Sequence, residues 1–153
     1  PEILALKQQI FSDLDHLAPS QAILASNTSS ISISEISSVT ERPEKVIGMH
    51  FFNPVPIMKL LELVRHDGVG ESTIAFAQEF SEAIGKTAIL VNDVPGFATS
   101  RLGVVLGNEA IRMLASTRRL SRVRMGQRST MKMAEMAHQK LIWIRQDLSS
   151  LMI

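Results

Sequence analysis

Apolar and polar positions follow two different periods along the first 115 residues, and each change of period separates a predicted helix from a predicted strand. Apolar residues at helical spacing predict helices over 2–16, 33–39, 71–84 and 98–115. Short apolar runs predict strands over 22–25, 45–52, 59–64 and 87–91. This alternation predicts an α/β fold with a mainly parallel sheet, to which a hairpin around the two prolines adds antiparallel strands at the edge.

The helical patterns also predict which side chains face a core. The apolar face of the first helix comprises Ile3, Leu6, Ile10, Leu14 and Leu17. In the helix over 71–84 it comprises Ile74, Ala77, Phe80 and Ile84, and in the last helix Leu102, Val105, Leu106, Ala110 and Met113. Ser32 followed by Glu35 predicts a capping box that opens the helix over 33–39.

The hairpin stretch holds the strongest candidate chemistry. His50 ends one apolar run, two prolines follow, and Glu62 lies inside the next apolar run. If the turn folds the second run back beside the first, each side chain gives the other the polar partner that both need among apolar neighbours. A carboxylate that orients a histidine ring prepares it as a general base. The alternative is a plain β-hairpin in which the histidine is structural and the glutamate lies at the rim. The residue types alone favour this alternative.

Five small polar residues follow the strand over 22–25, from Ser26 to Ser30. Ligands bind at the carboxyl ends of the strands in open α/β sheets, so these hydroxyls are candidate ligand-binding groups. Local hydrogen bonds to the backbone are an equally good interpretation. In the loop after the next hairpin strand, His66 is expected to be solvated.

Composition limits the class of protein. The chain has 153 residues, of which 45% are hydrophobic and 20% charged, with a mean hydropathy of +0.14, which fits a globular domain with its own core. The absence of cysteine excludes disulfides, thiolate metal sites and a cysteine nucleophile, and we predict no bound metal. No apolar run is long enough to span a bilayer. A cytoplasmic or organellar-matrix location fits these features.

The net charge of +1 hides an asymmetry. Residues 117–153 carry eight lysines and arginines against two acids, whereas residues 1–116 carry eight against thirteen. We therefore expect a boundary near residue 116. The basic segment could form an amphipathic helix for nucleic acid, an anionic membrane or a calmodulin-like partner, but an incidental basic helix is the favoured interpretation. The segment has one aromatic residue, Trp143, and no nucleic-acid-binding motif, so we expect no nucleic-acid binding.

Three separated motifs resemble the L-3-hydroxyacyl-CoA dehydrogenase family, including the short-chain 3-hydroxybutyryl-CoA dehydrogenases. They are Ile23-Leu24-Ala25-Ser26-Asn27-Thr28-Ser29-Ser30, His50-Phe51-Phe52-Asn53-Pro54-Val55-Pro56 with the following Lys59-Leu60-Leu61-Glu62-Leu63-Val64, and Asn92-Asp93-Val94-Pro95-Gly96-Phe97. They occur in the family's order and spacing over about residues 1–115. The resemblance implies the second half of a Rossmann-like domain, followed by the start of an all-α C-terminal domain.

The resemblance also implies an activity and a site. The family oxidises the 3-hydroxyl of an acyl-CoA substrate and passes hydride to NAD. His50 matches the family's base and Glu62 the carboxylate that orients it. Ser29 matches a serine that bonds the substrate oxygen beside the nicotinamide. Cofactor contacts are implied for Asn53, near that centre, and for Glu2 and Lys7, on a helix that borders the dinucleotide.

The sequence departs from the family's pattern at both ends. The glycines of this chain form no Gly-x-Gly-x-x-Gly loop to bind the pyrophosphate, and the sequence starts at Pro1 inside a domain, so we expect a fragment with little NAD affinity. Ser100 stands where many relatives have a substrate-contacting asparagine. After Ala115 the family's Gly-His-Pro-x-Gly-Pro segment does not follow. A reading-frame shift would explain this, and coding DNA that encodes no such segment in an adjacent frame would exclude it.

These observations predict three parts, which are a partial NAD-binding domain over 1–94, the first helix of a C-terminal helical domain over 95–115, and a basic tail over 116–153. The predicted activity is NAD-dependent oxidation of a 3-hydroxyacyl-CoA, weak or absent in this chain alone. The alternative is a non-enzymatic remnant or interaction module with a basic tail. The resemblance implies homodimers that form through the C-terminal domain. We expect this chain to lack most of that domain, so a dimer is doubtful here.

Overall fold

The computed structural model describes residues 1–120, with side chains up to residue 116. The described residues divide into two units, one over Glu2–Arg101 and the other with Pro1 and residues 102–120. Most of the predicted basic tail, residues 121–153, lies outside the described residues. No helix within residues 1–120 is long and apolar enough to cross a membrane.

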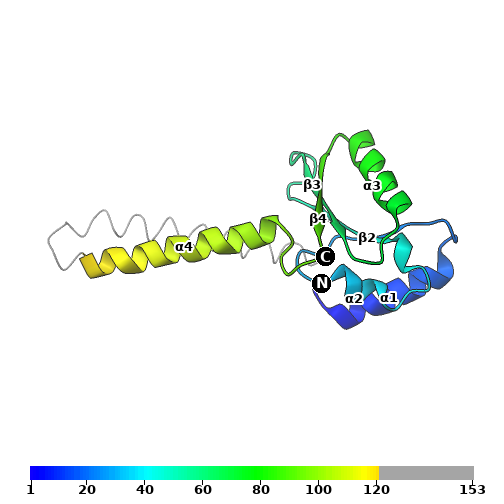
Figure 1. Cartoon of the computed structure of the whole chain (residues 1–153), viewed down its shortest axis with the longest axis horizontal. Helices are drawn as coiled ribbons and strands as arrows, with labels where there is room; N and C mark the ends of the chain where they lie inside the picture. The colour runs from blue at the N-terminus through cyan, green and yellow to red at the C-terminus, as the bar shows by residue number, and fades with distance from the viewer. Residues whose placement is uncertain (121–153) are drawn as a thin grey trace. The chain divides into compact units, whose positions relative to one another are not determined.

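All the predicted helices and strands are present, with shifted ends (Figure 1). The helices are α1 (Leu4–Leu17), α2 (Ile33–Ser37), the short 3-10 helix η1 (Pro43–Lys45), α3 (Glu71–Ala83) and α4 (Thr99–Leu120). The strands are β1 (Leu24–Ser26), β2 (Val46–Phe51), β3 (Leu60–Arg65) and β4 (Thr87–Asn92). The largest shift is at the end of α4, which continues unbroken through the composition boundary near residue 116.

The four strands form one mixed sheet in the order β1-β2-β3-β4. β1 pairs parallel with β2, β2 antiparallel with β3, and β3 parallel with β4. The α/β prediction is confirmed, but the expectation that the hairpin lies at the sheet edge is wrong. Crossovers through α2 and α3 place β1 and β4 outside the hairpin, because parallel neighbours need such connections whereas a hairpin does not.

Helices cover both faces of this sheet (Figure 1). On the face of α1 and α2, the core contains Phe11, Leu24, Ile33, Ile36, Val46, Val64 and Phe97. On the face of α3, it contains Ile47, Met49, Leu61, Leu63, Ile74 and Ala77. Successive strand residues point to opposite faces, so His50 shares the face of Val46, and Glu62 shares the face of Val64.

The predicted buried face of α1 is wrong. Its five residues, Ile3, Leu6, Ile10, Leu14 and Leu17, are 39–82% exposed. Phe11 is buried instead, and Leu4 and Ala18 pack against the same cluster. Residues seven apart lie nearly on one side of a helix, so α1 carries two apolar stripes, and the one that includes the large Phe11 ring packs on this unit. In α3, Ile74 and Ala77 are buried as predicted, but Phe80 and Ile84 are exposed. The predicted apolar face of α4 is exposed along its length.

The loop histidine was also predicted incorrectly. His66 is buried, and its Nε2 lies 3.1 Å from the carbonyl oxygen of Val46 and 3.2 Å from that of Pro43. Its Nδ1 accepts a hydrogen bond from the N–H of Gly68. The ring therefore ties the end of β3 to the start of β2, because one tautomer satisfies both of its nitrogens with backbone groups.

Gly48 lets α2 pack closely on the sheet, two residues before His50. A Cβ atom there would lie 2.7 Å from Cβ of Val64 and 2.9 Å from Cδ1 of Ile33. Both neighbours are fully buried, so neither can move away cheaply. We expect Gly48→Ala to lower the free energy of unfolding by about 1–3 kcal/mol, measured by urea denaturation. The control is Gly103→Ala, where a Cβ meets nothing within 4 Å, and equal effects of the two changes would contradict this packing.

An ion pair holds the end of α1 to the turn before η1. Arg42 Nε donates to Asp15 Oδ1 at 2.5 Å, and its guanidinium also donates to the carbonyl oxygens of Asp15, Ala18 and Pro19. The hydrogen bond from the N–H of Glu41, followed by that from Arg42, lowers the pKa of the Asp15 carboxyl below its usual value of 3.8. These donors stabilise the charged carboxylate, so this contact favours the folded state only while Asp15 is ionised.

This lowered pKa predicts an acid-sensitive contribution to stability. A group with a lowered folded-state pKa stabilises the fold fully above its unfolded pKa and loses that contribution as the pH falls through the folded value. We expect Asp15→Asn to reduce the free energy of unfolding at pH 7 and to make little difference well below pH 3.8. Urea denaturation of both proteins across this range measures the difference, and Asp13→Asn is the control. If the two proteins differ in their free energy of unfolding by the same amount at every pH, ionised Asp15 is not the source of the stabilisation.

Candidate active site

The structure places His50 and Glu62 directly opposite each other on β2 and β3. His50 Nδ1 lies 2.7 Å from Glu62 Oε2. The histidine is 6% exposed and the glutamate fully buried. The predicted pairing of the two apolar runs therefore occurs, and the two polar groups meet between the central strands on the face that carries α2.

Glu62 receives its other hydrogen bonds from the start of α4. Its Oε1 accepts from the N–H groups of Ala98, at 3.1 Å, and Thr99, at 2.8 Å. Its Oε2 accepts from Thr99 Oγ1 at 2.8 Å. Unpaired N–H groups at a helix N-terminus favour a negative charge, so this setting stabilises the ionised carboxylate.

The proton on the His50 ring follows from this arrangement. An ionised Glu62 can only accept hydrogen bonds, so Nδ1 of His50 must carry the hydrogen that it shares with Oε2. In the neutral ring Nε2 then has a free lone pair, and it lies 3.1 Å from Ser29 Oγ. Ser29, His50 and Glu62 thus form one hydrogen-bonded chain, and Nε2 of the central His50 is its proton-accepting atom.

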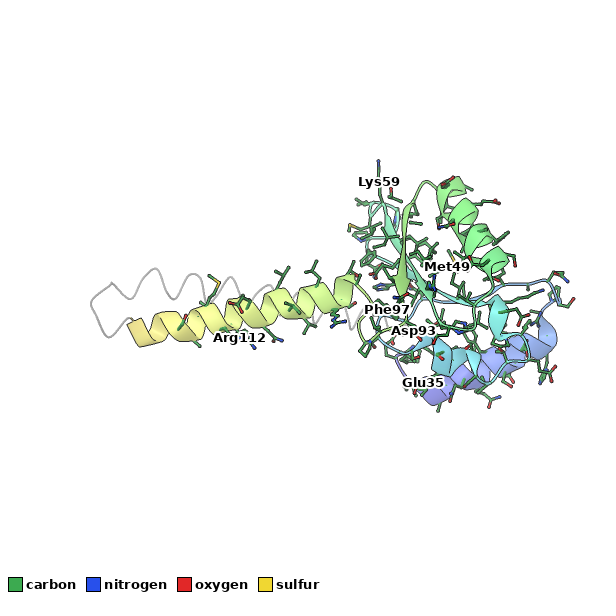
Figure 2. All side chains as sticks on the ribbon, viewed as in Figure 1. Glu35, Met49, Lys59, Asp93, Phe97 and Arg112 are labelled. Carbon is green, nitrogen blue, oxygen red and sulfur yellow. The ribbon has the colours of Figure 1, made fainter. Side chains whose placement is uncertain are left out.

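Two phenylalanine rings enclose the histidine. The Phe52 ring lies 4.6 Å from the His50 ring between centroids, and the Phe97 ring lies 5.9 Å away in an edge-on arrangement. Phe97, labelled in Figure 2, is 2% exposed. These rings limit the orientations open to the imidazole, so its Nε2 stays directed at Ser29.

Two of the small polar residues after β1 make different kinds of contact. Ser29 contacts His50. Thr28 Oγ1 instead accepts a hydrogen bond from the N–H of Ile31, so it satisfies a nearby backbone group. Ser32 also caps α2, because its Oγ accepts from the N–H of Glu35. The Ser32 contact of the predicted capping box is therefore confirmed, but no hydrogen bond from the Glu35 side chain completes the box in the described part of the chain.

The remaining predicted site residues lie apart from the pair. Thr28 Oγ1 donates to Glu2 Oε2 at 2.6 Å, and Lys7 Nζ lies 3.9 Å from Glu2 Oε1, so these residues gather beside the run that carries Ser29. Asn53 is exposed, three residues after His50, and no hydrogen bond joins it to His50, Glu62 or Ser29 in this part of the chain.

Sequence reasoning missed Thr99 and the phenylalanines Phe52 and Phe97. A helix start after Pro95-Gly96-Phe97 was a visible signal for free N–H groups, since such groups are common at a helix N-terminus. No spacing in the sequence could show that this turn comes back to Glu62, 37 residues earlier. That contact depends on β4 lying beside β3.

Comparisons with known proteins agree with this geometry. The family model of the 3-hydroxyacyl-CoA dehydrogenase NAD binding domain matches residues 1–94. A probable 3-hydroxybutyryl-CoA dehydrogenase of Bacillus subtilis is 50% identical over 110 residues, which are 72% of this chain and 38% of the relative. The 3-hydroxybutyryl-CoA dehydrogenase of Clostridioides difficile is 45% identical over 114 residues, which are 74% of this chain and 41% of the relative.

A solved structure shows the same fold. The crystal structure of (S)-3-hydroxybutyryl-CoA dehydrogenase from Ralstonia eutropha matches with a TM-score of 0.73 and 41% identity, over 76% of this chain and 41% of that one. The chain thus spans about two fifths of the length of the relatives that it matches. Since the family model covers well over half of its residues, the chain belongs to the 3-hydroxyacyl-CoA dehydrogenase family.

Proposed function

We propose that the whole protein oxidises a 3-hydroxyacyl-CoA to the 3-ketoacyl-CoA with NAD, and that this chain carries the acid–base centre of that reaction. The observation that supports this best is the hydrogen-bonded chain of Ser29, His50 and Glu62. Oxidation of a secondary alcohol needs a group that takes the hydroxyl proton, and a buried neutral imidazole with a lone pair on Nε2 is suited to that role. The names of the relatives support the substrate class.

In this proposal His50 accepts the proton of the substrate hydroxyl at Nε2. Glu62 already holds the Nδ1 hydrogen at 2.7 Å, so its charge stabilises the imidazolium that forms. In the reverse direction the protonated ring returns the proton to the substrate oxygen. The N–H groups of Ala98 and Thr99 act as fixed donors to Oε1 of Glu62, so they complement the negative charge that faces the imidazolium.

Ser29 positions the substrate oxygen in this scheme. Its hydroxyl lies 3.1 Å from Nε2, so an oxygen bonded to both groups would sit where proton transfer is direct. The serine can donate to that oxygen as negative charge develops on it, which is a small electrostatic contribution.

The residues present fit the reactive end of the cofactor. Bound NAD supplies the hydride acceptor. The polar run after β1 lies at the carboxyl end of a parallel strand, where open α/β sheets bind ligands, and it carries Ser29. We assign Ser29 and Asn53 to the nicotinamide end, and Glu2 and Lys7 to the border of the dinucleotide. A glycine-rich pyrophosphate loop is absent from these 153 residues, so we expect weak NAD binding by this chain alone.

We assign residues 1–94 to a partial NAD-binding domain, 95–115 to the first helix of a C-terminal helical domain, and 116–153 to a basic tail unlike the family. The competing function is a non-enzymatic remnant whose tail binds an acidic partner. The charge of residues 117–153 favours this function, because that segment contains eight basic residues and only two acidic ones.

A transplant tests the proposal. In a chimera, residues 1–115 replace the aligned segment of the Bacillus subtilis relative, and the oxidation of NADH with acetoacetyl-CoA is followed by absorbance. We expect the chimera to turn over and the isolated chain to show little or no activity. A chimera that is folded and binds NADH but has no activity would favour the remnant.

A further inference from the structure

Thr99 contacts both oxygens of the Glu62 carboxylate, through two different groups. Its N–H donates to Oε1 and its Oγ1 donates to Oε2, each at 2.8 Å. Oε2 is also the oxygen that lies 2.7 Å from His50 Nδ1. The threonine hydroxyl and the imidazole therefore share one oxygen atom of a fully buried carboxylate.

This arrangement fixes the rotation of the carboxylate group. The N–H groups of Ala98 and Thr99 bind only Oε1. A carboxylate that the helix holds at one oxygen can still rotate about the Cγ–Cδ bond of the glutamate. The Thr99 hydroxyl holds the second oxygen and occupies one of its lone pairs. The lone pair that remains on Oε2 is the one directed at His50.

We propose that Thr99 is a positioning residue of the acid–base centre, whose hydroxyl holds Glu62 in the orientation that aligns His50. The inference rests on the function proposed above and deepens it. Thr99 acts through Glu62 and His50, and it is not assigned any contact with substrate or cofactor.

The turn that leads into Thr99 is itself held in place. Asp93 lies beside α2 (Figure 2), where its Oδ2 accepts from Ser32 Oγ at 2.7 Å and from the N–H of Ser34 at 2.8 Å. Gly96 has a φ of +75°, and a Cβ atom there would lie 3.1 Å from the backbone nitrogen of Arg101, so glycine is needed for this close turn. A threonine on a fixed turn loses little further entropy when it binds Glu62.

Helix capping alone does not explain this hydroxyl. A capping side chain accepts a hydrogen bond from a helix N–H group, whereas the Thr99 hydroxyl donates to a carboxylate. Because Thr99 is the first residue of α4, its own N–H is already available to Glu62 without the side chain. The hydroxyl therefore adds a contact that the helix does not need.

Thr99→Val tests the inference, because valine keeps the shape but replaces the donor with a methyl group. A methyl carbon approaches an oxygen to about 3.3–3.6 Å, so it would turn Oε2 away from His50. The first readout does not depend on turnover. It is the proton NMR resonance of His50 Nδ1–H in the 153-residue chain, which is assigned by its loss in His50→Gln. We expect the resonance to move upfield and exchange faster in Thr99→Val, and to return in Thr99→Ser.

The kinetic readout is made in the chimera described above. We expect Thr99→Val to lower kcat roughly tenfold with little change in KM, and Thr99→Ser to restore it, because one hydrogen bond to a charged group is lost. Thr87→Val is the matched control at an exposed position on β4, and it should change neither readout.

The outcomes separate the two proposals. An unchanged Nδ1–H resonance in a folded Thr99→Val variant would overturn the positioning role, whatever the activity. If Thr99→Val fails to fold, Thr99→Ala removes the donor without crowding Oε2, and the same upfield shift is expected. A shifted resonance in the 153-residue chain, together with a folded chimera that has no turnover, would keep the positioning role and reject the proposed function.

Discussion

Replacing His50 with glutamine is expected to lower the turnover of the chimera by roughly two to four orders of magnitude. Glutamine fills similar space between Phe52 and Phe97 but has no group that can take a proton near neutral pH. The loss should appear in kcat, since substrate binding by groups elsewhere is unchanged. The measurement is NADH oxidation at saturating acetoacetyl-CoA.

His16→Gln is the matched control for this substitution. His16 is exposed in the last turn of α1, so its replacement should leave turnover as it was. Circular dichroism and NADH binding must be the same in both variants. A His50→Gln chimera with at least a tenth of the parent kcat would show that another group takes the proton.

Replacing Glu62 with alanine is expected to lower the free energy of unfolding of this chain by about 3–5 kcal/mol. Glu62 is fully buried and accepts hydrogen bonds from Ala98, Thr99 and His50. Removing it leaves the buried His50 Nδ1–H and the half-buried donors of Thr99 without this acceptor, and it also removes a fully buried side chain from one face of the sheet. Urea denaturation of the 153-residue chain measures the change.

Glu79→Ala is the control for stability, because Glu79 is exposed on α3. We expect it to change the free energy of unfolding by less than about 0.5 kcal/mol. A loss below about 1 kcal/mol in Glu62→Ala would mean that water or other groups satisfy the donors, and the carboxylate would then contribute to orientation rather than to stability.

The pairing of His50 with Glu62 could be predicted because two local signals agree. The prolines after His50 mark a turn, and two polar residues in apolar runs need each other as partners. The register then puts them directly opposite each other. Elements with strong periodicity, such as α3, were also predicted to within one residue.

Other features depend on contacts that no local pattern specifies. The position of β4 beside β3 moves the hairpin from the edge to the centre of the sheet and brings Thr99 to Glu62. The buried position of His66 depends on carbonyl groups about twenty residues earlier. In α1 the sequence offers two apolar stripes, and only packing decides that Phe11 faces the core.

The most direct test of the acid–base role follows the hydrogen on the alcohol carbon. The chimera is given NAD and (S)-3-hydroxybutyryl-CoA with deuterium at C3, and the NADH formed is analysed by mass spectrometry. The account predicts singly deuterated NADH from the chimera and only background amounts from its His50→Gln variant. A folded chimera that binds NAD but yields no deuterated NADH would contradict the claim that residues 1–115 carry the acid–base centre of the proposed reaction.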